Sequence, residues 1–378
     1  MHSRAQKPSE IYRFSGEIQA AFKADTTPWL HYQTYATHFS FSGYHRQALQ
    51  TWDIAGVRQP LLSTADTLRF GQLQASDARE YILQQAKNER ILIINEAHHN
   101  AQHRAFTRSL LRGLYDAGYR YLGLEALWDE QINERRYPTL SSGYYTVEPE
   151  FGNLLSEALQ MGYTLFGYEA SEGKNGKKRE IEQAENIRKF MDAHPDGKVL
   201  VHCGFSHVYE GPVTTWEKAM AGRLKEYTGI DPFTVNQERY TPKGKPENDP
   251  LYVQWLRDHK EPQVLIDSAG DVFRGMVEPW QTDVVVLHPR VEDVDGRPGW
   301  ITTGKTRYEI PVPKRASLPL LALAYRDGEP PELAVPADVL ELSTPGTPAV
   351  LYLPAGKYSI RLLDKDHQVI ETIDVKIK

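Results

Sequence analysis

Hydrophobic residues between about residues 75 and 240 alternate between helical spacing and short, continuous apolar runs. Ile82, Leu83 and Ala86 share one face of a helix, and residues 91–94, Ile-Leu-Ile-Ile, then resemble a strand that is buried on both sides. Similar pairs follow, including a predicted helix from Trp216 to Tyr227 before a strand at 233–235. This alternation predicts parallel βα units, and therefore an α/β fold with a mostly parallel sheet flanked by helices.

The two ends of the chain follow other patterns. Residues 1–65 are rich in aromatic residues with weak helical spacing, which predicts an N-terminal helical segment. After residue 290 the helical period disappears, and strand-like segments such as 349–353, 357–363 and 369–375 are separated by Pro, Gly and Asp. We therefore predict a helical segment at 1–65, an α/β catalytic-like core at 66–290 and a small C-terminal all-β domain at 291–378.

Composition narrows the range of partners. With 44 basic and 50 acidic side chains the formal net charge is −6, which gives no general attraction to nucleic acid or anionic lipid. No apolar run reaches transmembrane length. Cys203, the single cysteine, forms no internal disulfide and no cysteine-rich zinc site. The stretch Ser3-Arg4-Ala5-Gln6 resembles the end of a cleaved export signal, which favours a periplasmic or exported protein over a cytoplasmic one.

Polar side chains recur where the predicted strands end. Glu96 and His98 follow the strand at 91–94, Glu125 and Glu169 follow the next two strands, and His207 follows the strand at 199–201. A single glutamate after a strand is usually a solvated loop residue. In a parallel sheet, however, the ligand crevice lies outside the carboxyl ends of the strands, so these residues are expected to converge on one pocket.

Two common hydrolytic sites are excluded by the motifs. His99 and His103 have i, i+4 spacing, but the residues between them lack the glutamate of an H-E-x-x-H metalloprotease helix. No Gly-x-Ser-x-Gly sequence occurs, which argues against the nucleophile elbow of an α/β-hydrolase. We expect neither a zincin nor a serine triad.

The ordered motifs resemble a known superfamily. They are Asn95-Glu96-Ala97-His98, Glu125 at the next strand end, Arg179-Glu180-x-x-Gln183-Ala184-x-Asn186-Ile187, and Gly204-Phe205-Ser206-His207. Over roughly residues 75–240 the chain is similar to the erythromycin esterase, ChaN-like and TIKI/TraB superfamily. Asn95, Gln183 and Gly204 depart from the esterase pattern, which favours ChaN-like and TIKI-like members over macrolide esterases.

The resemblance implies Glu96, His98, Glu125, Arg179 and His207 as functional residues. It also implies functions of several kinds, because members of the group hydrolyse a lactone, act as metal-dependent proteases or bind haem. We predict water attack on an ester or amide carbonyl of a small-molecule or peptide substrate. In this hypothesis His98 and His207 act as the general base or as metal ligands, and Glu96 and Glu125 orient them. Arg179 stabilises the negative charge that develops on the carbonyl oxygen.

Cofactor and substrate contacts are predicted from the same residues. Glu96, His98 and His207 are candidate ligands of a divalent metal such as Mn, Zn, Co or Fe, and without metal His98 is the general base. The alternative is a haem- or iron-binding protein without turnover, with His98, His99, His207 or a tyrosine as axial ligand. Glu169, Trp128 and Tyr144 are candidate substrate-binding residues. The segment 128–150 suits either a mobile lid or a packed surface excursion.

Overall fold

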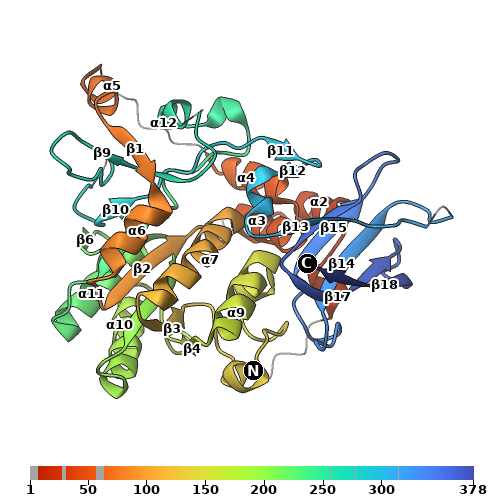
Figure 1. Cartoon of the computed structure of the whole chain (residues 1–378), viewed down its shortest axis with the longest axis horizontal. Coiled ribbons are helices and arrows are strands. Elements are labelled where there is room, and N and C mark those ends of the chain that lie inside the picture. Colours follow the sequence, from red (N-terminus) through yellow and green to blue (C-terminus); the bar gives the residue numbers. More distant parts are fainter. Residues whose placement is uncertain (1–6, 28–30, 57–63, 257, 277, 314) are drawn as a thin grey trace.

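A six-stranded parallel sheet forms the centre of the α/β core, on the left in Figure 1. The computed structural model describes residues 7–27, 31–56, 64–256, 258–276, 278–313 and 315–378. The strand order is β10-β8-β2-β5-β3-β4, and all neighbouring strands run parallel. Their bounds are β2 Ile91–Glu96, β3 Tyr119–Leu124, β4 Thr164–Gly167, β5 Lys198–Gly204, β8 Phe233–Asn236 and β10 Val284–Val285. The predicted α/β class is confirmed.

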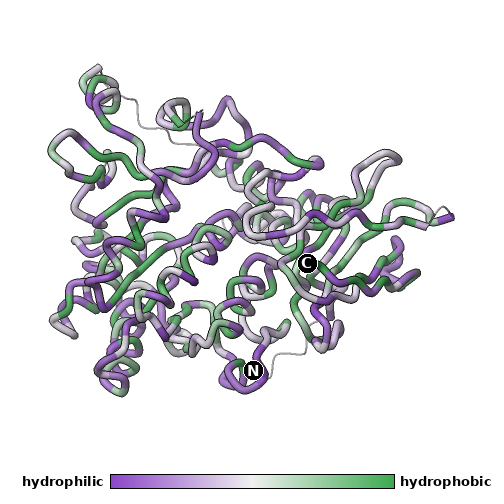
Figure 2. Tube along the Cα trace, in the orientation of Figure 1, coloured by the Kyte–Doolittle hydropathy of each residue, from purple (hydrophilic) through white to green (hydrophobic). Residues whose placement is uncertain are grey.

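Helices cover both faces of this sheet. Helices α6 (Ala78–Ala86), α7 (Ala101–Asp116) and α9 (Pro149–Met161) share a core with Leu92 and Ile94 on one face. Helices α10 (Gly176–Ala193) and α11 (Met220–Thr228) share a second core with Ile91 and Ile93 on the other. Side chains of a strand alternate between its faces, so a strand that is buried on both sides requires the unbroken apolar run at 91–94. Figure 2 shows the apolar stretches along these strands and helices.

The C-terminal region is a separate antiparallel sheet, as predicted. Its order is β15-β14-β17-β18, and the further pairs β13-β16 and β11-β12 lie outside it. The bounds are β11 Asp293–Val294, β12 Arg297–Pro298, β13 Thr306–Glu309, β14 Leu320–Arg326, β15 Asp338–Leu342, β16 Val350–Leu353, β17 Gly356–Leu363 and β18 Val369–Ile377. Alternate residues of β17 are buried, as expected for a sheet with one face on a core.

The N-terminal segment is helical and packs against this C-terminal sheet. Its helices are α1 Pro8–Ile11, α2 Ser15–Ala24, α3 His31–Phe41 and α4 His45–Asp53, whereas the next helix, α5 Thr64–Phe70, lies away from this sheet, where Phe70 packs with Tyr240 and Phe273 (Figure 1). Ile11 and Tyr12 share a core with Leu321 and Leu323 of β14. Trp29 and the proposed export-signal remnant at residues 3–6 lie outside the described residues. The division at residues 65 and 290 stays a prediction.

One local prediction differs from the structure, and a strand outside the predictions has an unexpected partner. The helix predicted from Trp216 begins only at Met220, because residues 212–213 (β6, Pro212–Val213) and 217–218 (β7, Glu217–Lys218) first form a short antiparallel hairpin. The apolar segment β9 (Gln263–Ile266) does not join the central sheet; it pairs antiparallel with β1 (Gln74–Asp77). In the part of the chain that the structure describes, no helix is long and apolar enough to span a bilayer.

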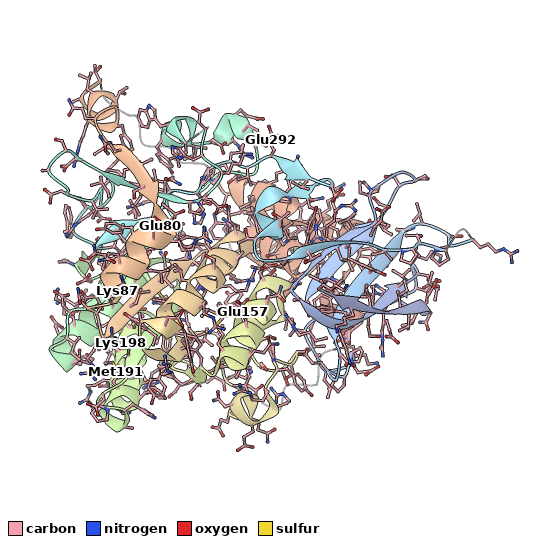
Figure 3. The ribbon with its side chains drawn as sticks, viewed as in Figure 1. Glu80, Lys87, Glu157, Met191, Lys198 and Glu292 are labelled. Carbon is pink, nitrogen blue, oxygen red and sulfur yellow. The ribbon has the colours of Figure 1, made fainter. Side chains whose placement is uncertain are left out.

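The remaining short elements connect these layers. They are α8 Ile132–Arg135, α12 Leu251–Trp255 and the 3-10 helices η1 Tyr145–Val147, η2 Phe205–Val208, η3 Pro246–Asn248 and η4 Gly299–Thr302. A lysine side chain at the start of β5 joins the amino-terminal edge of the sheet to the turn after α6. There Lys198 Nζ donates to the main-chain oxygen of Lys87 at 2.6 Å (Figure 3). The candidate site lies at the opposite, carboxyl edge.

Candidate functional site

The predicted site residues meet at the carboxyl edge of the central sheet, around a cavity of about 320 Å³. Glu96 is the last residue of β2, Glu125 follows β3, Glu169 follows β4 and His207 lies in η2 after β5. Seven of the predicted residues line the cavity: His98, Glu125, Trp128, Tyr144, Glu169, Arg179 and His207. Glu96 lies behind His98 and contacts the cavity only through it.

Glu96 holds His98 from behind. Nδ1 of His98 lies 2.9 Å from Oε1 of Glu96, and both residues are buried. Arg104 of α7, which is fully buried, binds the same carboxylate with Nε and Nη2, each at 2.6 Å from an oxygen. Arg104 Nη2 also donates to the main-chain oxygen of His98 at 2.9 Å. Glu96 and Arg104 together fix both the ring and the backbone of His98.

The ring of His98 is further fixed by its neighbours. It stacks on Tyr145 with a centroid distance of 3.8 Å and an interplanar angle of 15°. Gly204, at the end of β5, lies against its other side: a Cβ at Gly204 would come within 2.6 Å of His98 Nε2. Because Nδ1 is bound to Glu96, Nε2 is the ring nitrogen that is left to face the cavity.

Arg179 links the acidic side chains on the far side of the cavity. It lies near the start of α10 and is about one quarter exposed. Its Nε donates to Glu169 at 2.9 Å, and its Nη2 donates to both Glu125 and Glu169. Glu125 also accepts the main-chain N–H of Gly204 at 2.6 Å. The guanidinium group therefore sits between two carboxylates that come from different strand ends.

His207 completes this cluster. Its Nδ1 lies 2.8 Å from Glu180, which is buried and also accepts the main-chain N–H of Met220. Its Nε2 lies 2.8 Å from Arg179 Nη1, and its ring stacks on Trp216 with an interplanar angle of 7°. Since an arginine N–H can only donate, this contact is a hydrogen bond when Nδ1 carries the histidine proton and Nε2 accepts.

Electrostatics keep the two central carboxylates ionised. Burial acts to raise the pKa of Glu96, but the guanidinium of Arg104 outweighs it and holds that pKa well below the usual range. Burial likewise opposes ionisation of Glu125, yet His207, Arg179 and the Gly204 N–H lower its pKa to about 2. Burial acts to lower the pKa of His207, whereas the carboxylates of Glu125 and Glu180 raise it above its ordinary value.

The arrangement bears directly on the predicted metal. Among the described residues, no group of three or more His, Cys, Asp or Glu side chains is placed to hold a metal ion. Arg179 occupies the point on which Glu125, Glu169 and His207 converge, and Glu96 directs both oxygens at Arg104. Glu96, His98 and His207 therefore do not fit a shared metal in this arrangement, and the metal-dependent route stays a prediction.

An aromatic rim surrounds the cavity. Trp128 is 61% exposed and Tyr144 is 41% exposed, although both line the opening. Trp128 Nε1 donates to the main-chain oxygen of Ser141 at 2.9 Å, which holds the indole in place. The segment 128–150 that carries both residues is packed through the buried Leu140, whose N–H donates to the main-chain oxygen of Leu333 at 2.7 Å. These contacts match a packed excursion rather than a detached lid.

Four residues of the site were not predicted from the sequence. Arg104 lies in α7 and Tyr145 in the 3-10 helix η1, where polar and aromatic residues are common. Glu148, the N-cap of α9, accepts from Arg104 Nη1 at 3.1 Å. His202 lies within β5 and is buried 3.7 Å from Glu96, and burial lowers its pKa to about 4. A histidine inside an apolar strand is the one signal that the sequence offered.

Comparisons with known proteins identify no family. No family model and no curated protein matches the chain. Among solved structures, the type III effector HopBA1 is 11% identical, with a TM-score of 0.36 over 57% of this chain and 96% of that one. RRSP, a MARTX toxin effector domain from Vibrio vulnificus CMCP6, is 13% identical, with a TM-score of 0.33 over 59% of this chain and 45% of that one.

A third similar structure is the C-terminal region of Pasteurella multocida toxin, described as having a thiol-protease-like catalytic triad. It is 10% identical, with a TM-score of 0.30 over 92% of this chain and 54% of that one. Similarities at this level carry no inference about activity.

Proposed function

We propose that the chain is a hydrolase of ester or amide bonds, including peptide bonds, which acts at the cavity around His98. The observation that supports this proposal is the arrangement of His98. Its Nδ1 is bound to the buried Glu96, so its Nε2 faces the cavity that Arg179 also lines. A histidine that is oriented by a carboxylate and opposite a fixed cation suits general-base catalysis with stabilisation of a developing oxyanion.

The reaction follows from the roles of these groups. Nε2 of His98 removes a proton from a water molecule as the water oxygen attacks the carbonyl carbon of the substrate. The carbonyl electrons move onto oxygen, and the resulting oxyanion is stabilised by Arg179. When the bond to the leaving group breaks, the Nε2 proton passes to the leaving oxygen or nitrogen. Glu96 stays ionised throughout, because Arg104 keeps its pKa well below the usual range.

Arg179 keeps one donor for this role. A guanidinium has five N–H bonds. When Nε2 of His207 accepts, the contacts of Arg179 with Glu169, Glu125 and His207 use the Nε–H, one Nη1–H and both Nη2–H bonds, so a second Nη1–H stays available. The carboxylates of Glu125 and Glu169 hold the group in place and lower the entropic cost of presenting that donor.

A panel of chromogenic esters and short peptides tests the proposal. The purified chain is expected to turn over at least one class, and His98→Gln should lower kcat/KM by about 10²- to 10⁴-fold, the usual contribution of a general base. His259→Gln is the matched control, because His259 is a histidine outside the cavity lining. No turnover of either class, or equal rates for His98→Gln and wild type, would contradict the proposal.

Two further experiments test the metal-dependent and haem-binding alternatives, which involve the same residues. Loss of turnover after chelation, with recovery on adding Mn²⁺, Zn²⁺, Co²⁺ or Fe²⁺, would replace the metal-free route by a metal-dependent one. A visible-absorption titration with haem tests the binding alternative. A saturating shift of the Soret band that His98→Gln abolishes, together with no turnover, would favour a haem-binding protein.

A further inference from the structure

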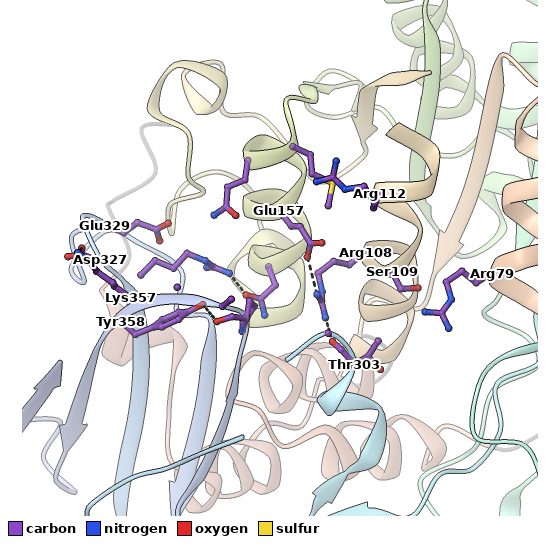
Figure 4. A pocket seen from close by; sticks show the side chains of 18 residues that line it. Arg79, Arg108, Ser109, Arg112, Glu157, Thr303, Asp327, Glu329, Lys357 and Tyr358 are labelled. Atoms are coloured by element: carbon purple, nitrogen blue, oxygen red, sulfur yellow. Dashed lines mark hydrogen bonds and ion pairs between the residues drawn. The ribbon is translucent and has the colours of Figure 1, made fainter. Parts of the chain in front are cut away.

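A second, larger cavity lies between the α/β core and the C-terminal sheet. Its volume is about 840 Å³, against about 320 Å³ for the cavity at His98. Helices α7 and α9 form one side, and the end of β14 and the start of β17 form the other (Figure 4). Known small-molecule sites are clefts of roughly 300–1,000 Å³ that lie preferentially between domains.

The lining of this interdomain cavity is predominantly basic, although the whole chain carries a formal net charge of −6. Five basic side chains line it, against three acidic ones: Arg79, Arg108, Arg112, Arg326 and Lys357, against Glu157, Asp327 and Glu329. Burial raises the pKa of Glu329 to about 7, so this carboxyl group is only partly ionised near neutral pH. A local excess of positive charge in an acidic protein favours an anionic ligand.

Two arginines are held against the same helix. Nη1 of Arg108 donates to Glu157 at 3.0 Å, and Nη2 of Arg326 donates to Asn153. Asn153 and Glu157 are four residues apart on α9 and so lie on one face of it, one turn apart. Arg108 approaches from α7 and Arg326 from β14, so two separate layers of the fold bring their guanidinium groups to the same wall.

Donors in this cavity stay without acceptors. Nη1 of Arg326 is buried and has no hydrogen-bond partner among the described residues. Arg112, one turn from Arg108 on α7, is exposed and forms no hydrogen bond or ion pair with any described residue. A buried guanidinium N–H without an acceptor is unfavourable by about 1–3 kcal/mol in general, so a ligand oxygen at this point would be stabilised.

We propose that this cavity binds a small organic anion through a carboxylate or phosphate group. In this proposal the oxyanion accepts from Arg326 Nη1, Arg112 adds positive charge to the same lining, and Met161 and Pro354 supply apolar lining for the rest of the ligand. Fork-shaped guanidinium donors match the geometry of both kinds of oxyanion. The proposal is independent of hydrolysis at His98, because the two cavities share no lining residue.

Isothermal titration calorimetry on the full chain tests it, with inorganic phosphate and citrate as probes at constant ionic strength. At least one probe should give saturable binding, and Arg326→Gln should weaken it by about tenfold or more, as expected for a lost hydrogen bond to a charged group. Arg112→Gln, an exposed change that keeps the fold, should weaken the same probe. Lys189→Gln on α10 removes the same charge outside the cavity and should leave binding unchanged.

The outcomes separate the ligand classes and decide the proposal. Binding of phosphate alone indicates a phosphate-bearing ligand, and binding of citrate alone indicates a carboxylate. No saturable heat with either probe would overturn the proposal. So would equal weakening by Lys189→Gln and Arg112→Gln, since that result would reflect net charge rather than a site. Thermal unfolding of each variant, followed by circular dichroism, confirms that the compared proteins are folded.

Discussion

Arg104 and Glu96 form a two-point ion pair in which Nε and Nη2 each lie 2.6 Å from a carboxylate oxygen. Neither side chain reaches solvent. Because both charges have lost their hydration, the ion pair is stable only if its hydrogen bonds replace the lost contacts with water. Two of the three remaining Arg104 donors reach the main-chain oxygen of His98 and the carboxylate of Glu148. Arg104 is therefore a positioning residue that acts on His98 through Glu96.

Two substitutions of Arg104 should separate its effect on the position of His98 from the effect of its positive charge on stability. Arg104→Lys keeps one positive charge but cannot bind both oxygens, so we expect a folded protein with lower kcat and little change in KM. Arg104→Gln leaves Glu96 and Glu148 buried without a cation, and should lower the free energy of unfolding by about 3–5 kcal/mol. Urea denaturation and steady-state kinetics measure the two effects.

Arg188→Lys is the matched control for this experiment, because Arg188 is 42% exposed and, among the described residues, pairs only with Asp192 at 3.8 Å. It should leave both stability and kcat close to wild type. Wild-type kcat in a folded Arg104→Lys protein would show that the two-point geometry does not position His98.

Glu125 should make folding stability depend on pH in the acid range. Its pKa is about 2 in the folded protein, against an ordinary value of 4.5. Because the folded-state pKa is the lower one, its contribution is complete above about pH 4.5 and is lost as the pH falls toward 2. A shift of this size corresponds to ~3 kcal/mol as an order of magnitude. The difference in unfolding free energy between wild type and Glu125→Gln should therefore shrink from pH 5 to pH 3.

Chemical denaturation at fixed ionic strength across that range provides the measurement. Glu185→Gln neutralises a glutamate on α10 outside the cavity lining and is the control against which the pH dependence of the Glu125→Gln difference is compared. A difference for Glu125→Gln that is constant or grows as the pH falls would contradict the assignment of its low pKa to His207 and Arg179.

The aromatic rim should contribute to substrate binding rather than to chemistry. Trp128→Ala and Tyr144→Ala remove exposed rings, so the fold should be unaffected, while KM should rise by about tenfold if each ring covers part of the substrate. The turnover number should change little, since neither ring contacts His98 Nε2 or Arg179 in any hydrogen bond. Trp280→Ala, which removes an indole of similar exposure (62%), serves as control.

The sequence predicted those parts of the candidate site whose positions follow directly from the order and direction of the strands. Glu96, Glu125 and Glu169 end successive strands, and parallel strands present those ends at one edge, so their meeting required no knowledge of side-chain contacts. The strand at 91–94 was also predicted correctly. Its side chains alternate between two buried faces of the sheet, so every position of the strand has to be apolar.

Residues whose positions depend on tertiary packing could not be predicted in this way. Arg104 belongs to a helix face whose other polar residues are common surface types, and only the fold shows that this face is buried. Tyr145 and Trp216 come from connecting segments whose path depends on the packing of the C-terminal sheet and of the hairpin before α11. The hairpin also explains why helical spacing alone placed the start of α11 too early. Catalytic, metal and haem roles stay predictions for the experiments above.

Gly204 offers a steric test of His98 that changes no charge. A Cβ at this position would lie 2.4 Å from His98 Cε1 and 2.6 Å from Nε2, closer than side-chain atoms approach one another. The backbone of Gly204 has φ −86° and ψ 144°, which any residue adopts, so alanine is opposed mainly by the ring and, less closely, by Glu125 Oε2 at 3.2 Å. Gly204→Ala should therefore displace His98 from Tyr145 and lower kcat/KM about as much as His98→Gln.

The displaced ring should also lose its contact with Glu96, so the variant should unfold at a somewhat lower denaturant concentration than wild type. Gly16→Ala, in helix α2 with open space at its Cβ, is the control and should be neutral or slightly stabilising. Full activity in Gly204→Ala would mean that Nε2 of His98 does not have to face the cavity from its present position, and the proposed base would have to be another group.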